Sequence, residues 1–263
     1  MIEFRQVHKY FDNEVVLEDV SFKINPGETK IILGASGSGK STILKLILGL
    51  IRPDSGQILV QDRDITKMGE RELVQIRGAI GMIFQEGALF DSLSVRENVG
   101  YRLSEEGKLS EEEINAEIIQ LLGFVGLEDA IDKMPGELSG GMKRRVGIAR
   151  ALVGTPKIVL YDEPTAGLDP ITKRAIVELM IKLRDTEGVT SIFVTHDLNA
   201  ASIIAMEHAM ADKDGRITIQ PAGDAADLLN TSFIMLQNGF VCFEGDYHEL
   251  MHSTLPYVRA FVS

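Results

Sequence analysis

The sequence has little cysteine and no long apolar run, and both absences narrow the kinds of protein that it can be. Cys242 is the only cysteine among 263 residues, which excludes an internal disulfide and any metal site built from several cysteines. No stretch reaches the eighteen or more uninterrupted apolar residues of a membrane span, and the opening MIEFRQVHKY lacks the apolar core of a signal peptide. We therefore expect a cytosolic protein that needs a partner for any work at a membrane.

Basic side chains are also in short supply. The chain has 27 Lys and Arg against 39 Asp and Glu, and this formal net charge of −12 disfavours a broad cationic face for nucleic acid. We predict no nucleic-acid partner. The hydrophobic fraction of 44% and the charged fraction of 25% are ordinary for a globular protein, and the length allows one domain with a sizeable core.

The stretch GASGSGKST, at residues 34–42, carries the most specific motif of the chain. It follows TKIILG, which predicts a buried strand, and precedes STILKLILGLI, whose apolar spacing predicts a helix. In this context backbone N–H groups wrap phosphates, Lys40 reaches the β and γ oxygens, and Ser41 ligates Mg²⁺. The residues predicted to bind nucleotide are Gly34, Ala35, Ser36, Gly37, Ser38, Gly39, Lys40, Ser41 and Thr42.

An apolar segment later in the chain ends in two carboxylates. The stretch IVLYDE predicts a strand with Asp162 and Glu163 at the carboxyl edge of a sheet, where ligands bind. We expect Asp162 to hold Mg²⁺ through water and Glu163 to polarise the attacking water as a general base. Gln85, after AIGMIF, is predicted to meet Mg²⁺ and the same water, and His196, after SIFVT, to donate to a γ-phosphate oxygen.

A second glycine turn lies about a hundred residues after the first. Its residues, Ser139, Gly140 and Gly141, directly precede the helical pattern GGMKRRVGIARALVG. A serine and two glycines at the start of a helix offer backbone donors and the positive end of the helix dipole to an anion. This turn has no lysine of its own, so the question is which chain holds the phosphate that it contacts.

The predicted elements give an α/β fold. Strand patterns at 2–7 and 15–24 indicate an N-terminal antiparallel layer. The stretches KIVLYDE and TSIFVTHD predict parallel core strands, joined by a crossover helix at ITKRAIVELMIKLRDTEG. Between them and the first glycine loop the pattern becomes mainly helical, so we expect a helical lobe, which carries the second glycine turn, to be inserted into an α/β core.

Taken in order, these motifs resemble those of the ATP-binding subunits of ATP-binding cassette (ABC) transporters, over essentially the whole chain. The matching motifs are Walker A at Gly34 to Thr42, the Q-loop at Gln85, the signature LSGGM at Leu138 to Met142, Walker B at Ile158 to Glu163, the D-loop AGLD at Ala166 to Asp169, and the switch His196. The resemblance implies an ATPase that uses ATP and Mg²⁺, and a P-loop cassette fold with a mixed core sheet. It also implies that an aromatic stacks on adenine, with Phe11 placed best and Tyr10 as the alternative.

The resemblance further implies one domain at 1–263. In it, residues 1–87 and 156–263 form a RecA-like core with its antiparallel β layer, and 88–155 form the helical signature subdomain. We expect a helical tail at 246–263. These boundaries are predictions from the positions of the motifs.

By the same resemblance, two copies of the chain pair head to tail. The signature turn of one subunit covers the γ-phosphate held by Walker A of the other, so it needs no lysine because Lys40 of the opposite chain supplies the charge. Asp169 would lie at the seam of this dimer and report the state of one site to the other. ATP binding would close the dimer, and hydrolysis with loss of phosphate would open it.

Finer motif features are similar to the ATPases of Mla-type and Mce-type lipid transport systems. They are FQEGALFDSLSVRENV, YDEPTAGLDPIT and the ending LPYVRAFVS. The similarity implies an integral-membrane permease of that type as a partner, with a small STAS-like subunit and a lipid-binding Mce protein as accessory subunits. It also implies a peripheral position on the cytoplasmic face of the inner membrane. Cassettes for phosphate or amino-acid uptake are the alternatives, and a soluble ABC ATPase of DNA repair or translation is a further one.

The chain departs from the family pattern after His196. Family members run from the switch into a single unit of strand, glycine turn and strand, whereas residues 207–230 add a segment that precedes or doubles this unit. The segment suits surface decoration or a regulatory contact. Within it, DKDG at 212–215 resembles the opening of a calcium loop, but the later ligands are absent, so we predict a turn.

Overall fold

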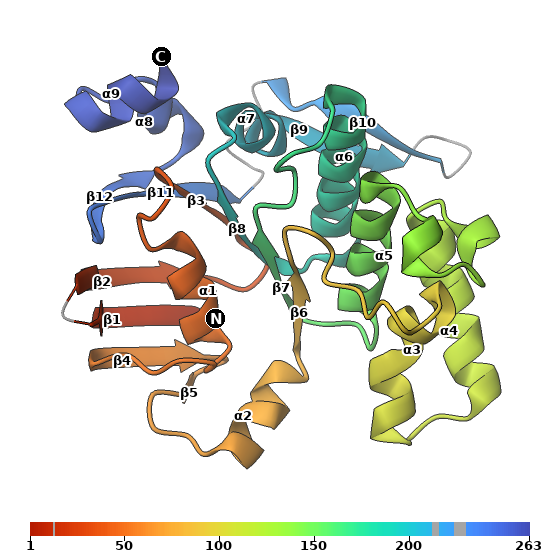
Figure 1. Cartoon of the computed structure of the whole chain (residues 1–263). Helices are drawn as coiled ribbons and strands as arrows, with labels where there is room; N and C mark the ends of the chain where they lie inside the picture. Colours follow the sequence, from red (N-terminus) through yellow and green to blue (C-terminus); the bar gives the residue numbers. More distant parts are fainter. Residues whose placement is uncertain (13, 212–215, 224–229) are drawn as a thin grey trace.

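A mixed sheet forms the centre of the computed structural model, which describes residues 1–12, 14–211, 216–223 and 230–263 (Figure 1). Its strands lie in the order β12-β11-β3-β8-β7-β6. Their bounds are Phe240–Gly245 for β12, Thr231–Gln237 for β11, Thr29–Leu33 for β3, Thr190–Thr195 for β8, Ile158–Asp162 for β7 and Ile80–Ile83 for β6. From β11 to β6 the neighbouring strands pair in parallel, and β12 pairs antiparallel with β11. The carboxyl ends of the parallel strands therefore meet at one edge of the sheet.

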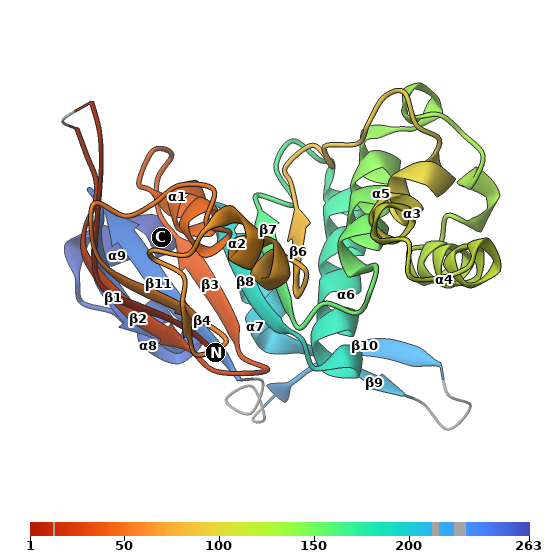
Figure 2. The same cartoon turned by 90° about the horizontal axis from the view of Figure 1, so that it is seen from below.

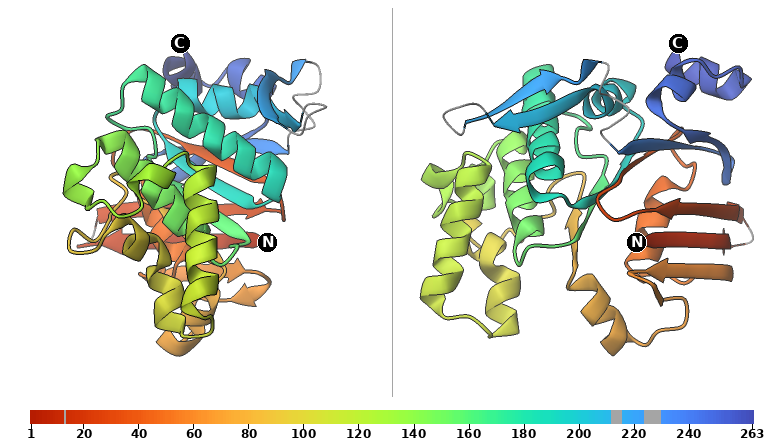
Figure 3. Two further views of the ribbon diagram at one scale, coloured as in Figure 1. Left: turned by 90° about the vertical axis from the view of Figure 1, so that its right-hand side faces the viewer. Right: turned by 180° about the vertical axis from the view of Figure 1, so that it is seen from behind.

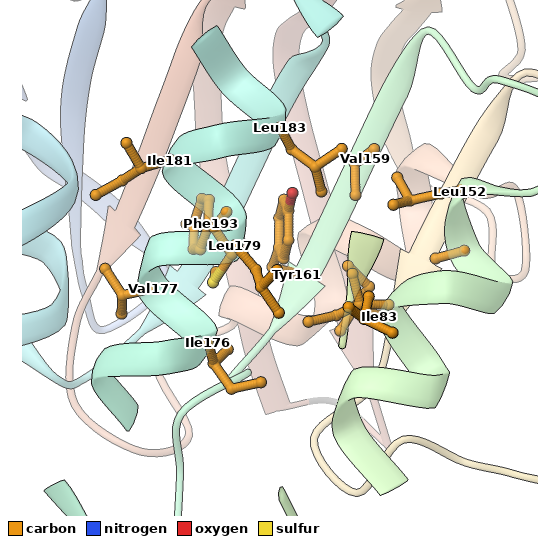
Figure 4. Close-up of a cluster of buried hydrophobic side chains, with 14 of the residues drawn as sticks. Ile83, Leu152, Val159, Tyr161, Ile176, Val177, Leu179, Ile181, Leu183 and Phe193 are labelled. Carbon is orange, nitrogen blue, oxygen red and sulfur yellow. The ribbon is translucent and has the colours of Figure 1, made fainter. Parts of the chain in front are cut away.

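The central strands are apolar along their length because both faces of the sheet are covered. Strands β3 and β8 are buried at every position, and successive side chains of a strand point to opposite faces. On one face, helices α6 (Pro170–Glu187) and α7 (Leu198–Met206) pack over the cluster that includes Tyr161 and Phe193. Figure 4 shows side chains of α6 beside these two rings. These two rings stack with their centroids 4.1 Å apart, which fixes β7 against β8 just before the carboxylates.

The opposite face of the sheet packs against an antiparallel layer and helix α1. The layer has the strand order β2-β1-β4-β5, and a second hydrophobic cluster fills the space between it and the core sheet. The bounds are Ile2–Phe11 for β1, Glu14–Ile24 for β2, Ser55–Val60 for β4, Arg63–Asp64 for β5 and Lys40–Ile47 for α1. A short helix, α2 (Glu70–Arg77), connects this layer to β6.

A helical lobe lies between β6 and β7 in the chain. It contains α3 (Val95–Glu106), α4 (Glu111–Phe124) and α5 (Gly140–Leu152), with two short 3₁₀ turns at Glu128–Ala130 and Pro135–Glu137. Ser94 and Ser110 begin α3 and α4 with capping boxes. Figure 2 shows the lobe on one side of the molecule and the antiparallel layer on the other. The predicted α/β class, with a mixed core sheet, an antiparallel layer and inserted helices, is confirmed.

The added segment forms a separate hairpin. Strands β9 (Glu207–Ala211) and β10 (Ile217–Pro221) pair only with each other in the described residues, and they lie beside α6 (Figure 3). The Arg174 guanidinium of α6 bonds both carboxylate oxygens of Glu207 at 2.8 and 2.6 Å. The hairpin thus precedes the β11 and β12 unit. The turn predicted at 212–215 lies outside the described residues.

The chain ends in two short helices, α8 (Tyr247–Met251) and α9 (Pro256–Val262), at the site of the predicted tail. They pack beside β11 and β12 in Figure 1. Across the described residues, no helix combines the length and the apolar character that a membrane crossing requires.

Candidate functional site

The glycine loop after β3 curls tightly because its glycines adopt backbone angles that other residues avoid. Gly34 has φ 150° and Gly39 has φ 99°. A Cβ at Gly34 would lie 2.6 Å from the carbonyl oxygen of Leu236, and one at Gly39 would lie 2.7 Å from Cδ2 of Leu17. The loop therefore lies directly against β11 and β2, and its remaining backbone faces the carboxyl edge of the sheet.

Lys40 is enclosed by this loop, with only 6% of the residue exposed. Its Nζ donates to the carbonyl oxygens of Gly34 at 2.8 Å and Ala35 at 2.9 Å, and lies 3.9 Å from Oε1 of Glu163. Burial lowers the pKa of Lys40, and the nearby carboxylates act in the opposite direction. The ammonium is thus held inside the loop by weak backbone partners that phosphate oxygens can replace.

Asp162 provides a carboxylate that fits a divalent cation. Its Oδ1 accepts a hydrogen bond of 2.8 Å from Oγ of Ser41. Burial raises the pKa of Asp162, and the charge of Glu163 adds to the effect. A carboxylate and a hydroxyl in a desolvated position are oxygen ligands of the kind that Mg²⁺ prefers. The residues present therefore fit the predicted magnesium site.

Glu163 and His196 form a contact at the edge of the same site. Glu163 has φ 49°, a left-handed conformation that costs a non-glycine residue on the order of 1–3 kcal/mol. Its N–H donates to the carbonyl oxygen of Val194 at 2.9 Å, and its Oε1 lies 2.9 Å from Nδ1 of His196. Thr195 donates to the other carboxylate oxygen at 3.3 Å. The strained turn therefore aims a carboxylate at the site, next to an imidazole whose side chain is 61% exposed.

These groups surround a cavity of about 640 Å³. Its lining consists of Val16, Ala35, Ser36, Gly37, Gly39, Lys40, Ser41, Thr42, Gln85, Glu163, Ala166, His196 and Phe261. The structure thus places the glycine loop, Gln85, Glu163 and His196 around one space, as the sequence predicted. Asp162 is not part of this lining and reaches the site through its hydrogen bond to Ser41. A lysine, the Glu163 carboxylate and backbone donors around such a cavity can bind a triphosphate and direct a water toward it.

The second glycine turn does not line this cavity in the described part of the chain. Ser139 caps α5, and its Oγ accepts from the N–H of Met142 at 3.3 Å. A Cβ placed on Gly140 would meet no atom within 4 Å, whereas one on Gly141 would lie 2.5 Å from Cγ2 of Thr172. Gly140 therefore faces open space, and the turn is free to meet a ligand from outside its own chain.

Asp169 also stands apart from the cavity lining. It caps α6, where its Oδ1 accepts from the N–H groups of Ile171 and Thr172, both at 3.1 Å. Hydrogen bonds from Thr172 hold the pKa of Asp169 below its ordinary value. The structure thus gives Asp169 a capping contact within its own chain.

Phe11, the predicted adenine platform, lies at the end of β1 and is 45% exposed. Lys9 stands over its ring, with Nζ 5.0 Å from the centroid. The alternative, Tyr10, donates its hydroxyl to Glu18 at 3.0 Å. Phe11 does not line the cavity. The residue of the antiparallel layer that lines it is Val16, on β2.

Two aromatic residues of α9 reach the site, and the sequence reasoning missed both. The Tyr257 hydroxyl accepts from the N–H of Ala35 at 3.3 Å and donates to the carbonyl oxygen of Leu236 at 3.4 Å, and Phe261 lines the cavity. Ala35 N–H, predicted to wrap phosphate, is engaged by this hydroxyl. The spacing of i and i+4 places the two aromatics on one helix face, which was the available signal.

Comparison with known proteins relates this arrangement to a family. The family described as ABC transporter matches residues 17–166. The chain is 39% identical to protein TRIGALACTOSYLDIACYLGLYCEROL 3, chloroplastic, of Arabidopsis thaliana, over 100% of this chain and 73% of that protein. It is 41% identical to the probable ribonucleotide transport ATP-binding protein mkl of Mycobacterium leprae, over 77% of this chain and 58% of that protein. It is 36% identical to the methionine import ATP-binding protein MetN of Histophilus somni, over 97% of this chain and 72% of that protein.

Solved structures share the fold. The dimeric post-hydrolysis state of the ATP-binding cassette MJ0796 bound to ADP and Pi matches with a TM-score of 0.77 and 32% identity, covering 94% of this chain and 98% of that chain. The structure of cbiO1 from Clostridium perfringens, part of the ABC transporter complex cbiONQ, matches with a TM-score of 0.75 and 29% identity, covering 93% of this chain and 88% of that one.

The raised pKa of Asp162 predicts that Asp162→Asn raises the thermal unfolding temperature of the nucleotide-free chain at pH 7. A carboxyl whose folded pKa exceeds its unfolded value of 3.8 stabilises the fold at low pH and loses this contribution as pH rises through the folded pKa. Asparagine keeps an oxygen for Ser41 and carries no charge. Thermal unfolding with and without MgATP should also show that the nucleotide raises the unfolding temperature of the variant less than that of the wild type.

Asp197→Asn is the matched control. Hydrogen bonds and charge from Lys173 outweigh the effect of burial and hold the pKa of Asp197 below its ordinary value. Its carboxylate therefore stabilises the fold at neutral pH, and this substitution should lower the unfolding temperature. A lower unfolding temperature for Asp162→Asn as well would show that the buried carboxylate of Asp162 is not destabilising.

Proposed function

The chain belongs to the ABC transporter family and is an ATP-hydrolysing, ATP-binding subunit, and from this premise we propose that the transporter it powers moves phospholipids or related lipids between bacterial membranes. The observation that supports this proposal most is the similarity to a relative named for trigalactosyldiacylglycerol, a lipid, over 100% of this chain. The relatives named for ribonucleotide transport and methionine import cover 77% and 97% of the chain. A cassette for phosphate or amino-acid uptake is the alternative.

We propose that the residues around the cavity act as in the predicted ATPase site. Lys40 binds the β- and γ-phosphates, and Glu163 accepts a proton from the attacking water while His196 stabilises charge on the γ-phosphate. The contact of 2.9 Å between Oε1 of Glu163 and Nδ1 of His196 supports these paired roles. Ser41, Asp162 and Gln85 would hold Mg²⁺, which neutralises phosphate charge when it is bound.

We propose that a second copy of the chain completes this site. The signature turn lies outside the cavity of its own chain, and Gly140 has open space around it. The N-terminus of α5 can therefore present its backbone donors and helix dipole to a nucleotide held by another chain. The similarity to the cassette MJ0796, whose solved structure is dimeric with ADP and Pi bound, supports a dimer. Asp169, in the loop before α6, would lie at the seam, and Phe11 would stack on adenine.

The membrane partner is proposed to be a permease of the Mla or Mce type, on the cytoplasmic face of the inner membrane. An apolar surface beside Gln85 suits such a contact, because Phe90 and Tyr101 are exposed with ring centroids 5.0 Å apart. The guanidinium of Arg150 lies over the Phe90 ring, with Cζ 5.8 Å from the centroid, and holds the ring by a cation–π contact. A STAS-like subunit and a lipid-binding Mce protein would accompany the permease.

Glu163→Gln should trap an ATP-dependent dimer. Glutamine preserves the shape of the side chain but cannot accept the proton, so ATP would bind and persist. Sedimentation velocity should show a monomer without nucleotide and a dimer with MgATP, and ATP turnover should fall about a thousandfold or more.

Gly140→Asp in the Glu163→Gln background is the control for the shared site. An aspartate in the first turn suits the helix dipole, and its Cβ has open space, so the monomer should keep its stability. Its charge would face the γ-phosphate of the partner and should abolish the dimer. Dimerisation that survives this change would contradict a role for the signature turn in the neighbouring site.

The lipid assignment is tested by ATP hydrolysis of the complete transporter in proteoliposomes. At fixed ATP concentration, hydrolysis should rise when a phospholipid acceptor and the lipid-binding subunit are supplied, and it should not rise with phosphate, methionine or ribonucleotides other than ATP. The Glu163→Gln complex in the same vesicles reports any hydrolysis by contaminants. Stimulation by one of the small solutes, with no response to lipid, would replace the lipid assignment while leaving the ATPase in place.

A further inference from the structure

Arg144 is a buried cation that forms no ion pair among the described residues, although the charge of Glu86 acts on it, and the site chemistry gives it no role. The residue is 8% exposed, and none of the recorded ion pairs involves it. Its Nε donates to the carbonyl oxygen of Gln85 at 2.6 Å, and its Nη2 donates to the carbonyl oxygen of Ala166. Its Nη1 is buried with no hydrogen-bond partner. Burying a guanidinium this way is costly, so its contacts call for an explanation.

The two carbonyl groups belong to different loops of the nucleotide cavity. Gln85 follows β6, and Ala166 lies in the loop that leads from β7 to Asp169 and α6. Both residues line the cavity. Arg144 itself lies in the second turn of α5, the helix that Ser139 caps. A single side chain therefore joins the signature helix to both loops.

The remainder of α5 holds the first of these loops along its length. Arg150 donates to the carbonyl oxygens of Gly87 at 2.9 Å and Ala88 at 2.8 Å. A Cβ on Gly147 would lie 3.1 Å from Cα of Gly87, so the two backbones are in close contact. The loop after β6 is thus fixed to α5 at several points, and Arg144 extends the same attachment to the loop before α6.

We propose that Arg144 is a positioning residue that couples the two nucleotide sites of the dimer. This inference rests on the proposed head-to-tail arrangement, in which Gln85 faces the nucleotide of its own chain while Ser139 and Asp169 face that of the partner. Through Arg144, a shift of the Gln85 loop in one site moves the signature helix and the Asp169 loop of the other. Site-to-site cooperativity in ATP hydrolysis is the property that this contact controls.

The geometry requires an arginine. A guanidinium is a rigid fork with five N–H donors, and it can donate to two carbonyl groups in different directions at once. The ammonium of a lysine is a single point on a flexible chain, so it would keep the charge but release one of the two loops. Arg144→Lys therefore keeps the positive charge but loses the simultaneous contact with both loops, whereas Arg144→Gln loses the charge as well.

Arg145 offers a matched control on the same helix. It donates to the carbonyl oxygens of Val125 at 3.0 Å and Gly126 at 3.2 Å, both inside the helical lobe. It contacts neither cavity loop among the described residues. Arg145→Gln therefore removes an equal charge and the same kind of hydrogen bond without touching the proposed connection.

The test compares Arg144→Lys, Arg144→Gln and Arg145→Gln with the wild type, using the full chain assembled with its permease. ATP hydrolysis is measured against ATP concentration, and binding of a fluorescent ATP analogue is measured on the isolated monomer. We expect the Hill coefficient to fall from about two toward one in both Arg144 variants. The kcat should fall about tenfold because the loops are misplaced, and nucleotide binding to the monomer should change less than about twofold.

The control should keep the wild-type Hill coefficient and kcat. Unchanged cooperativity in the Arg144 variants, or an equal loss in Arg145→Gln, would overturn the inference. Thermal unfolding shows whether the variants fold. If neither Arg144 variant folds, the role of Arg144 is structural and the inference is overturned as well. The proposed dimer is judged separately by the Glu163→Gln chain: if that chain dimerises with MgATP while the Arg144 variants stay cooperative, only the coupling role falls.

Discussion

The pairing of β3, β8 and β7 at the carboxyl edge of the core sheet sets every distance on which the site depends. Leu33 is in register with Thr195, and Val194 with Asp162, so the glycine loop, the carboxylates and the switch histidine leave the sheet at the same level. The stacked rings of Tyr161 and Phe193 fix two of these strands from beneath. The pairing brings Lys40 within 3.9 Å of Glu163 although the two residues are far apart in the chain. Opposite charges in a partly dry cavity interact strongly, which suits a site that must bind a triphosphate and release it.

In the proposed dimer, one chain builds only part of the site. The glycine loop and the strand-end residues converge on the cavity, but the signature turn and Asp169 do not. A Cβ at position 140 would have open space, so packing within the chain does not require a glycine there. A division of the site between two copies explains both observations and makes nucleotide binding equivalent to subunit association. In that scheme the helical lobe is the movable part, and α5 connects its motion to the loops at the sheet edge.

The sequence predicted the elements whose signals are local, and the structure shows why others were missed. The glycine loop and the carboxylates of β7 follow from short motifs, because the same few residues fix both the backbone and the chemistry. The short helix α2 was not predicted, since its amphipathic pattern spans little more than two turns. Tyr257 reaches Ala35 across 222 positions of the chain, and Arg144 reaches Gln85 across 59, so neither contact leaves a local pattern. The addition at 207–230 stays a prediction from the sequence, and the anchoring of Glu207 to α6 through Arg174 depends on tertiary contacts that leave no local pattern.

The central claim, that each site is built from two chains, is tested most directly by mixing two inactive variants. Lys40→Ala removes the lysine proposed to bind phosphate, and Gly140→Asp blocks the signature turn, so neither variant alone should form the ATP-dependent dimer or hydrolyse ATP. A mixed dimer would contain one intact site, made of Lys40 from the second variant and the signature turn of the first. ATP hydrolysis measured after mixing should therefore reappear, at up to about half of the wild-type rate, because only mixed dimers form and each holds one intact site of two. A mixture as inactive as its components would contradict the account.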